Sequence, residues 1–271
     1  MAADRFDLQE AARRLDVHYQ TAYRWVREGR LPAVRVRGRY EIGADDLDAF
    51  ARERDAPAMA TGQRGRREWG RSSDRLLKAL LEGDERTAAD VVARLRAQDE
   101  PALDIIGRVV VPAMVAIGDG WAAGELSVAH EHRASAITSR LLAAIDRRRP
   151  GRPRGTVVVT APPGEQHGLP LEMAAAVLRE DGWTVELLGQ DMPADALFDF
   201  VASVAPDLVV LTVTAPDTAE AAEAIARELT GTGHDVLVGE PGRSLDDLVR
   251  AARTVRAEQR RLLARRPPEG Q

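Results

Sequence analysis

The sequence predicts a multidomain chain of α and α/β class: a winged helix-turn-helix, a four-helix bundle, and a doubly wound, Rossmann-like parallel sheet. Three observations support this. Residues 6–50 combine helical spacing with a stretch of period-two alternation. Residues 74–150 are helical in pattern throughout, and strands alternate with helices from 151 to 271. We therefore expect a winged helix-turn-helix over 1–54, a linker over 55–73, a bundle over 74–150 and an α/β domain over 151–271.

The composition is that of a globular protein with enough material for two or three cores. The 271 residues are 44% hydrophobic and 30% charged. The lack of cysteine excludes disulfides, thiolate zinc sites and cysteine nucleophiles. No apolar run reaches the length of a membrane span, and no secretory-type apolar stretch opens the sequence. We therefore expect a cytoplasmic protein without membrane contact.

Charge is distributed unevenly along the chain. Residues 1–75 hold 16 Arg against 13 Asp and Glu, a balance of +3, whereas residues 76–271 hold 22 Lys and Arg against 30 Asp and Glu, a balance of −8. A basic head on an acidic body indicates that the head alone meets a polyanion.

The head has the pattern of a helix-turn-helix followed by a hairpin. Apolar residues over 6–15 have helical spacing, residues 16–18 form a short turn, and a second helix is expected over 19–28. Residues 33–42 then alternate with period two around Gly38, which predicts a small hairpin. Two helices joined by a three-residue turn are the supersecondary unit of many DNA-binding proteins.

The polar side chains of the head suit double-stranded DNA. Arginine on a hairpin suits phosphate or minor-groove contact, and polar groups on the second helix suit base edges. The alternative is a structural helix pair with a solvated arginine face. The stretch over 23–42, YRWVREGRLPAVRVRGRYEI, resembles the excisionase-type winged helix of the MerR-like superfamily. The expected DNA-contacting residues are His18, Gln20, Thr21, Tyr23, Arg24, Arg35, Arg37 and Arg39.

The middle of the chain predicts four helices after a linker. Residues 55–73 have no evident periodicity and are rich in Gly, Ser and Arg. Asp84 is well placed as the N-cap of the second helix, and Pro112 predicts an irregularity in the third. Short connections favour an antiparallel bundle. The four helices are expected over 73–83, 84–98, 101–121 and 127–149.

One face of the fourth helix is unusual for a core. Val128, Glu131 and His132 lie at helical spacing with Ser135 and Ser139, and so share much the same face. Trp121 is expected just beyond the end of the third helix, beside the start of that face. A wall of this composition suits a ligand that is partly apolar and partly hydroxylated.

The C-terminal third predicts a parallel sheet with a ligand at its carboxyl edge. His167 follows the first strand and lies at the start of the first helix of this part. Neutral imidazole binds metals, and Glu165 could accept the other ring proton and fix the tautomer. Strands are expected over 155–162, 184–193, 207–216 and 235–242, with helices over 167–183, 194–206, 217–231 and 244–266.

Two spacings and the domain order resemble one family. Trp121 is followed after nine residues by Glu131-His132, and Glu165 is separated from His167 by one residue. In these features the chain resembles, over nearly its whole length, the CarH-like cobalamin-dependent photoreceptor regulators. The resemblance implies a non-enzymatic, homo-oligomeric transcription regulator that binds adenosylcobalamin or another cobalamin between the bundle and the sheet domain. Release of the adenosyl group by light would change its assembly and its DNA affinity.

The same resemblance implies roles for individual residues. His167 would be the lower axial ligand of cobalt, displacing the dimethylbenzimidazole tail. Thr212 and Gly239 would match the small-residue motifs that hold this nucleotide tail. The remaining expected cofactor-binding residues, on the adenosyl side and beside His167, are Trp121, Val128, Glu131, His132 and Glu165.

Four departures from the family pattern keep alternatives open. Pro170 stands where the family has a glycine, Glu240 stands in place of the second glycine of a pair, and the stretch after the fourth strand is shortened. Ala122 occupies a position where the family can use a histidine to capture cobalt after photolysis. One alternative is therefore a regulator whose diverged fold takes another tetrapyrrole or no cofactor. A minor alternative is a corrinoid carrier for methyl transfer, although such carriers do not need an N-terminal DNA-binding domain.

Overall fold

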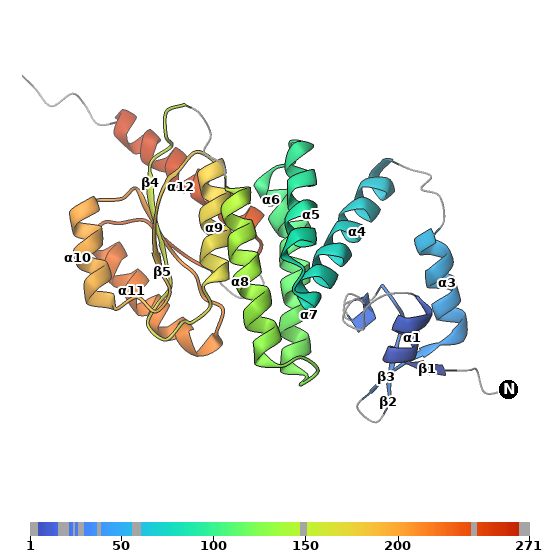
Figure 1. Ribbon diagram of the computed structural model, residues 1–271. Coiled ribbons are helices and arrows are strands. Elements are labelled where there is room, and N and C mark those ends of the chain that lie inside the picture. The colour runs from blue at the N-terminus through green and yellow to red at the C-terminus, as the bar shows by residue number, and fades with distance from the viewer. Residues whose placement is uncertain are drawn as a thin grey trace, which may run out of the picture. The chain divides into compact units, whose positions relative to one another are not determined.

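The computed structural model describes residues 5–15, 22–23, 25–26, 30–36, 39–55, 61–146, 151–239 and 243–265. The chain divides into two compact units, Met1–Leu95 with Arg108–Thr138, and Arg96–Gly107 with Ser139–Gln271. Figure 1 shows the small N-terminal sheet, the run of helices and the larger C-terminal sheet. Among the described helices, none has the length and apolar character needed to cross a membrane.

The head contains the predicted hairpin and one additional strand. Its order is β1 (Arg5–Asp7), α1 (Leu8–Arg14), β2 (Val34–Val36), β3 (Arg39–Gly43) and α3 (Ala44–Asp55). The three strands form an antiparallel sheet in the order β1-β3-β2. Asp7 caps α1, since its Oδ1 accepts a hydrogen bond from the amide of Glu10 at 2.8 Å. The sequence did not reveal β1, because three residues are too few to display alternation.

A single aromatic and aliphatic core holds the head together. Trp25 is buried and packs against Phe50, with ring centroids 5.0 Å apart. Within the predicted second helix, the described residues 22–23 and 25–26 are helical, and residues 16–18 lie outside the described part. The core of this head is made by Leu8, Ala11, Ala12, Leu15, Ala22, Trp25, Leu31, Ile42, Leu47 and Phe50.

The first long helix corrects the predicted linker. Helix α4 spans Thr61–Glu82, so residues 61–73, for which we expected no regular structure, are helical. The expectation failed because glycines at 62, 65 and 70 obscure the helical pattern, while Trp69 and Ser73 extend it. Ser73 is buried and donates to the carbonyl of Val109 at 3.1 Å, and Trp69 lies 5.6 Å below the guanidinium of Arg108. These contacts stabilise the early turns despite their low helix propensity.

The remaining helices follow the sequence closely. They are α5 (Glu85–Ala97), α6 (Ala102–Ile105), α7 (Val111–Ala122) and α8 (Val128–Ile145). Asp84 caps α5 as predicted, accepting the Thr87 amide at 3.0 Å and the Thr87 hydroxyl at 2.6 Å. A π-helical turn, Ile106–Val110, separates α6 from α7, which confirms the irregularity expected near Pro112. Trp121 lies inside the last turn of α7, within the range 101–121 expected for the third helix, and not just beyond the helix end.

The C-terminal sheet has four parallel strands in the order β5-β4-β6-β7. The strands are β4 (Thr156–Thr160), β5 (Thr184–Gly189), β6 (Leu208–Leu211) and β7 (Val236–Val238). The helices are α9 (Leu169–Glu180), α10 (Ala194–Val204), α11 (Ala219–Gly231) and α12 (Leu245–Arg265), with a short 3-10 turn, Pro216–Thr218. In the sheet, β5 lies on one side of β4 and β6 lies on the other, so the strand order reverses between β4 and β6.

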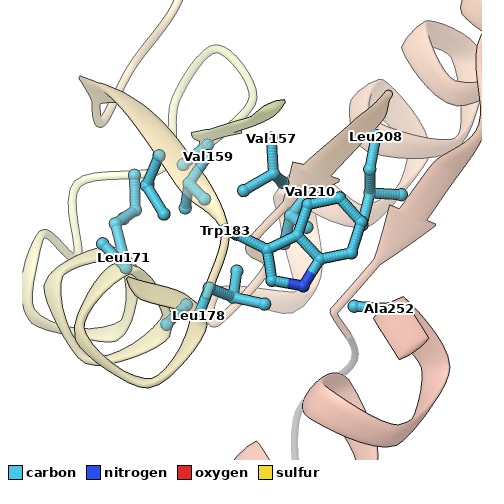
Figure 2. Packing of buried hydrophobic residues seen from close by; sticks show 12 residues of the cluster. Val157, Val159, Leu171, Leu178, Trp183, Leu208, Val210 and Ala252 are labelled. Atoms are coloured by element: carbon cyan, nitrogen blue, oxygen red, sulfur yellow. The ribbon is translucent and has the colours of Figure 1, made fainter. Parts of the chain in front are cut away.

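Two apolar cores cover the two faces of this sheet. Figure 1 shows α9 and α12 on one side of the sheet and α10 and α11 on the other. Alternate residues of β4 serve the two faces: Val157 and Val159 pack with α9 and α12, and Val158 packs with α10 and α11. In Figure 2 the indole of Trp183 lies among Val157, Val210 and Leu178, beside Ala252 of α12. The predicted doubly wound α/β domain is confirmed.

Helix α12 is fastened to this domain by arginines. Arg253 donates to the buried carboxylate of Asp181 at 2.5 Å, and Arg256 donates to Asp207 at 2.6 Å. Hydrogen bonding to Asp181 raises the pKa of Arg253 above its ordinary value. Because α12 follows β7 within a few residues, the structure agrees with the shortening noted in the sequence.

Candidate functional site

The segment between β4 and α9 presents a histidine held by a buried acid. The His167 side chain is 57% exposed, whereas the Glu165 side chain is 0% exposed. Nδ1 of His167 lies 2.5 Å from Oε1 of Glu165, and the amide of His167 donates to the same oxygen at 3.1 Å. A carboxylate acceptor at Nδ1 places the ring proton there, which leaves Nε2 as the atom with an available lone pair. This is the arrangement that a metal-ligating histidine requires.

The carboxylate of Glu165, which supports His167, is ionised. Burial alone would raise its pKa, but the amides of Ala215 and Thr214 and the contacts from His167 lower the pKa from 4.5 to about 2. Oε2 accepts the amides of Thr214 and Ala215 at 2.7 and 2.8 Å, and the hydroxyl of Thr218 at 3.3 Å. Thr218 is a residue that the sequence gave no reason to select, because its contact with Glu165 spans more than fifty positions.

These bonds hold together two loops at the carboxyl edge of the sheet. The segment 161–168 follows β4, and the segment 212–218 follows β6, on the two sides of the point where strand order reverses. In open α/β sheets this reversal is where ligands bind. Glu165 connects both segments and supports the exposed ring of His167. The fold therefore places His167 at the position where a ligand is expected on topological grounds.

Thr212 and Gly239 lie next to each other at the ends of β6 and β7. The Thr212 amide and hydroxyl both donate to the Thr160 carbonyl, at 2.9 and 3.4 Å, and the Gly239 amide donates to the Leu211 carbonyl at 2.7 Å. A Cβ on Gly239 would lie 3.4 Å from that carbonyl oxygen, at the border of ordinary van der Waals contact. The role of Gly239 in binding a nucleotide tail stays a prediction. Glu240 lies outside the described residues.

Pro170, the first departure from the family pattern, is accommodated without distortion. It occupies the first turn of α9, where its missing N–H would have no intrahelical partner. The helix then continues through the buried Leu171. The substitution therefore leaves intact the backbone that carries His167.

The predicted residues of the helical part are grouped on α7 and α8. Trp121 and Val128 are 51% and 52% exposed, so both side chains offer apolar surface. Glu131 Oε2 lies 2.6 Å from His132 Nδ1, and its Oε1 accepts the hydroxyl of Ser135 at 2.6 Å. The Glu-His pair is thus oriented by its own helix.

Ser139 has a different role from the one expected. The sequence placed it on the ligand face with Ser135, but its hydroxyl donates to Glu172 of α9 at 3.0 Å. Just beyond the end of α8, Asp146 accepts a hydrogen bond from Arg179 at 2.7 Å. Ser139 therefore connects α8 to α9, because its hydroxyl is hydrogen-bonded to the carboxylate of Glu172.

The predicted DNA contacts are described in part. His18, Gln20, Thr21, Arg24 and Arg37 lie outside the described residues. Arg35 is exposed on β2, and Arg39 begins β3, paired in register with Val36.

Tyr23 corrects one expectation for this surface. It is partly buried and packs edge-on against Tyr40, with ring centroids 5.9 Å apart, and does not lie fully on the outward face. Tyr40 was not among the predicted residues of this surface, although its place opposite Arg35 in the hairpin alternation was a usable signal.

The comparisons with known proteins agree with this arrangement. A helix-turn-helix domain model matches residues 6–55, and B12 binding domain models match residues 73–146 and 155–257. The HTH-type transcriptional repressor CarH of Myxococcus xanthus is 34% identical over 146 residues, which cover 54% of this chain and 48% of CarH. The HTH-type transcriptional repressor CarA of the same organism is 38% identical over 87 residues, 32% of this chain and 30% of CarA. The matches thus span half or less of each relative.

A solved structure supports the fold independently. The Methanosarcina barkeri monomethylamine corrinoid protein superposes with a TM-score of 0.57 at 15% identity, over 68% of this chain and 98% of its own. At this identity the likeness concerns the fold alone.

Together these findings describe a class: a region that matches helix-turn-helix domains is followed by two regions that match B12 binding domains. Over the matched stretches the chain is similar to CarH and CarA, in agreement with the resemblance noted from the sequence. Both of these relatives are named as transcriptional repressors.

Proposed function

We propose that this protein is a transcription regulator that binds double-stranded DNA through its head and senses a corrinoid through its B12-binding regions. The observation that carries the proposal is the exposed His167 ring, held at Nδ1 by the buried, ionised Glu165 at the reversal point of the sheet. The domain matches and the CarH and CarA relatives support the connection to transcription.

The described residues fit a corrinoid. Nε2 of His167 would hold the cobalt of the corrinoid, and Glu165 favours the tautomer that leaves this nitrogen available as a ligand. Thr212 and Gly239, which lie next to each other at the ends of β6 and β7, would bind the displaced nucleotide tail.

On the helical side, we propose that the upper ligand of the corrinoid contacts Trp121, Val128, Glu131 and His132. Trp121 and Val128 offer exposed apolar surface to a purine ring. Glu131 accepts hydrogen bonds from its helix neighbours and would accept a further one from a ribose hydroxyl. This combination favours adenosylcobalamin over a corrinoid with a small upper ligand.

We extend the proposal to a light response. When bound, adenosylcobalamin would supply a cobalt–carbon bond that visible light breaks. With Ala122 at the position of the family's histidine, the candidates for capturing the freed cobalt face are His130 and His132. Nδ1 of His130 lies 2.7 Å from the Ser127 hydroxyl, and Nδ1 of His132 lies 2.6 Å from Glu131, so in each ring Nε2 is the remaining nitrogen.

In this account Trp121 and Val128 lose their apolar contact once the adenosyl group has left. The free energy of that contact would shift the assembly state of the chain and its DNA affinity, because a ligand shifts an equilibrium only by its unequal affinity for the two states. We propose that the chain forms a homo-oligomer in one of the two states and that this oligomer dissociates in the other.

The test is an absorption spectrum of the full chain after incubation with adenosylcobalamin in the dark and desalting. The wild type and His234→Ala, a control histidine of the same domain, are expected to retain a corrinoid band that changes under green light. His167→Ala is expected to lose the band or to show it at a shifted wavelength, because cobalt loses its protein ligand.

Each other outcome has a definite meaning. A spectrum unchanged in His167→Ala would contradict the role of His167. A retained band that is indifferent to light would refute the light response while leaving corrinoid binding intact. If the wild type retains no corrinoid, the proposal fails, and haem and linear tetrapyrroles become the ligands to screen.

A further inference from the structure

Arg35 of the hairpin makes a different kind of contact from Arg5, Arg13 and Arg14. Arg5 lies 3.6 Å from Glu41, and Glu10 accepts from both Arg13 and Arg14. Arg35 is exposed and makes no ion pair within the described residues; its contact there is with an aromatic ring. Among the residues that the structure describes, no carboxylate pairs with its positive charge.

That ring belongs to Tyr40, the cross-strand partner of Arg35. The β2–β3 register pairs the two residues directly, and the guanidinium carbon lies 5.8 Å from the ring centroid. Directly paired residues of an antiparallel ladder lie on the same face. A guanidinium at this distance above an aromatic face is attracted by the ring quadrupole, and its rotamer freedom is reduced.

Tyr40 is itself supported by the second helix of the helix-turn-helix. Tyr23 meets Tyr40 edge-on, at 5.9 Å between centroids and an interplanar angle of 71°. This geometry is one of the preferred arrangements of aromatic pairs. Both tyrosines pack against the buried core of the head. An aromatic support thus runs from the second helix through Tyr23 and Tyr40 to Arg35 on the hairpin.

We propose that this aromatic support positions Arg35 for contact with a DNA phosphate and fixes the hairpin relative to the second helix. Arg35 is the contacting residue, and Tyr40 and Tyr23 are positioning residues. The proposal rests on the proposed DNA-binding function. It adds how the hairpin and the second helix are held so that both contact the same duplex. An arginine held in place before binding loses less conformational freedom on binding than a mobile one.

The test is a double-mutant cycle on DNA affinity in the full chain. The probe is a short mixed-sequence DNA duplex, titrated at several KCl concentrations. Arg35→Gln should reduce the salt slope of log K by about 0.9, the value for one phosphate contact per protomer. Tyr40→Leu should weaken binding by about two- to fivefold when Arg35 is present, on the scale of an exposed cation–π contact.

The combination of variants separates positioning from folding. In the Arg35→Gln background, Tyr40→Leu should cause no further loss, because nothing remains to be positioned. Tyr40→Phe keeps the ring and should bind like the wild type. Thermal unfolding of each variant is measured alongside, and Tyr23→Phe serves as a second ring-preserving control if Tyr40→Leu folds poorly.

The possible failures differ from one another. An equal loss from Tyr40→Leu in both backgrounds, or an unchanged salt slope in Arg35→Gln, would overturn the positioning proposal while DNA binding stands. A loss in Tyr40→Phe as large as in Tyr40→Leu would also overturn it, because the ring would then be irrelevant. If the wild type binds no duplex at low salt, the proposed DNA-binding function fails, and this inference fails with it.

Discussion

Replacing Glu165 by Gln tests the anchor of the candidate site. The side chain is 0% exposed, and its two oxygens accept hydrogen bonds from Thr214, Ala215, Thr218 and His167. Glutamine has nearly the same shape but one acceptor oxygen in place of two. One set of buried donors would therefore face an NH₂ group, and leaving buried donors unsatisfied costs about 1–3 kcal/mol.

The pKa of Glu165 gives a second measure of the same loss. It is lowered from 4.5 to about 2, and about 1.4 kcal/mol corresponds to one pKa unit, so ionised Glu165 contributes on the order of 3 kcal/mol to folding. Since the folded-state pKa is the lower one, this contribution is complete above pH 4.5. It is lost as the pH falls towards about 2, where the folded protein also takes up the proton.

The assay is hydrogen exchange of peptides that cover β4 and β6, which reports the stability of this domain separately from the head. At neutral pH, Glu165→Gln should lower the free energy of opening by roughly 2–3 kcal/mol relative to the wild type. The difference should shrink as the pH is lowered below 4.5. Glu172→Gln, which affects the hydrogen bond from the Ser139 hydroxyl, is the matched control and should cost about 1 kcal/mol or less.

Two results would refute this reasoning. If Glu165→Gln and wild type agree within about 0.5 kcal/mol at neutral pH, Glu165 does not anchor the two loops. If the difference is large but independent of pH, its cause is packing and not the ionised carboxylate.

Corrinoid affinity should fall by about 10- to 100-fold in the same variant, as for other carboxylates that orient a metal-ligating histidine.

Three further predictions concern the scaffold. Leu178→Ala, which empties a fully buried position beside Trp183, should cost about 2–5 kcal/mol in urea unfolding, whereas the exposed Leu262→Ala should change stability by less than about 0.5 kcal/mol; equal effects would contradict the assigned core. Gly189→Ala should destabilise by about 1 kcal/mol or more, because φ is +89° there, whereas Gly118→Ala in α7 has open space and should stabilise by about 0.5–1 kcal/mol; thermal melts that reverse this order would be incompatible with the backbone described. Asp84→Ala should lower the melting temperature and Asp84→Asn should largely preserve it, since an amide oxygen still caps α5; a melting temperature unchanged in Asp84→Ala would rule out the cap.

Much of the fold could be predicted because its signals are local. The apolar runs of β4 and β6 and the helical spacing of α8 and α9 are visible in short windows, and strand–helix alternation determines the doubly wound topology. Asp84 and Pro112 act within a few residues of their own positions, so their effects could be anticipated. The three-residue β1 and the glycine-containing start of α4 lacked such signals, because contacts elsewhere in the chain stabilise them.

The candidate site divides in the same way. The Glu165–His167 pair was predictable because its two residues are almost adjacent in the sequence. Thr218 and the amides of Thr214 and Ala215 were not, since their contact with Glu165 depends on how two strands are placed in the sheet. The same reason explains why Ser139 was assigned to the ligand face when its partner is Glu172, and why the packing of Tyr23 on Tyr40 was missed.

The most direct test of the account is the DNA affinity of the full chain measured in the dark, without and with adenosylcobalamin, and again after illumination. We expect the affinity to change by about fivefold or more when the corrinoid is added, and the change to be reversed by light. His167→Ala should show the same affinity in all three conditions, and His234→Ala should respond like the wild type. Equal wild-type affinity in the three conditions, or an undiminished response in His167→Ala, would contradict the claim that His167 couples a corrinoid to DNA binding.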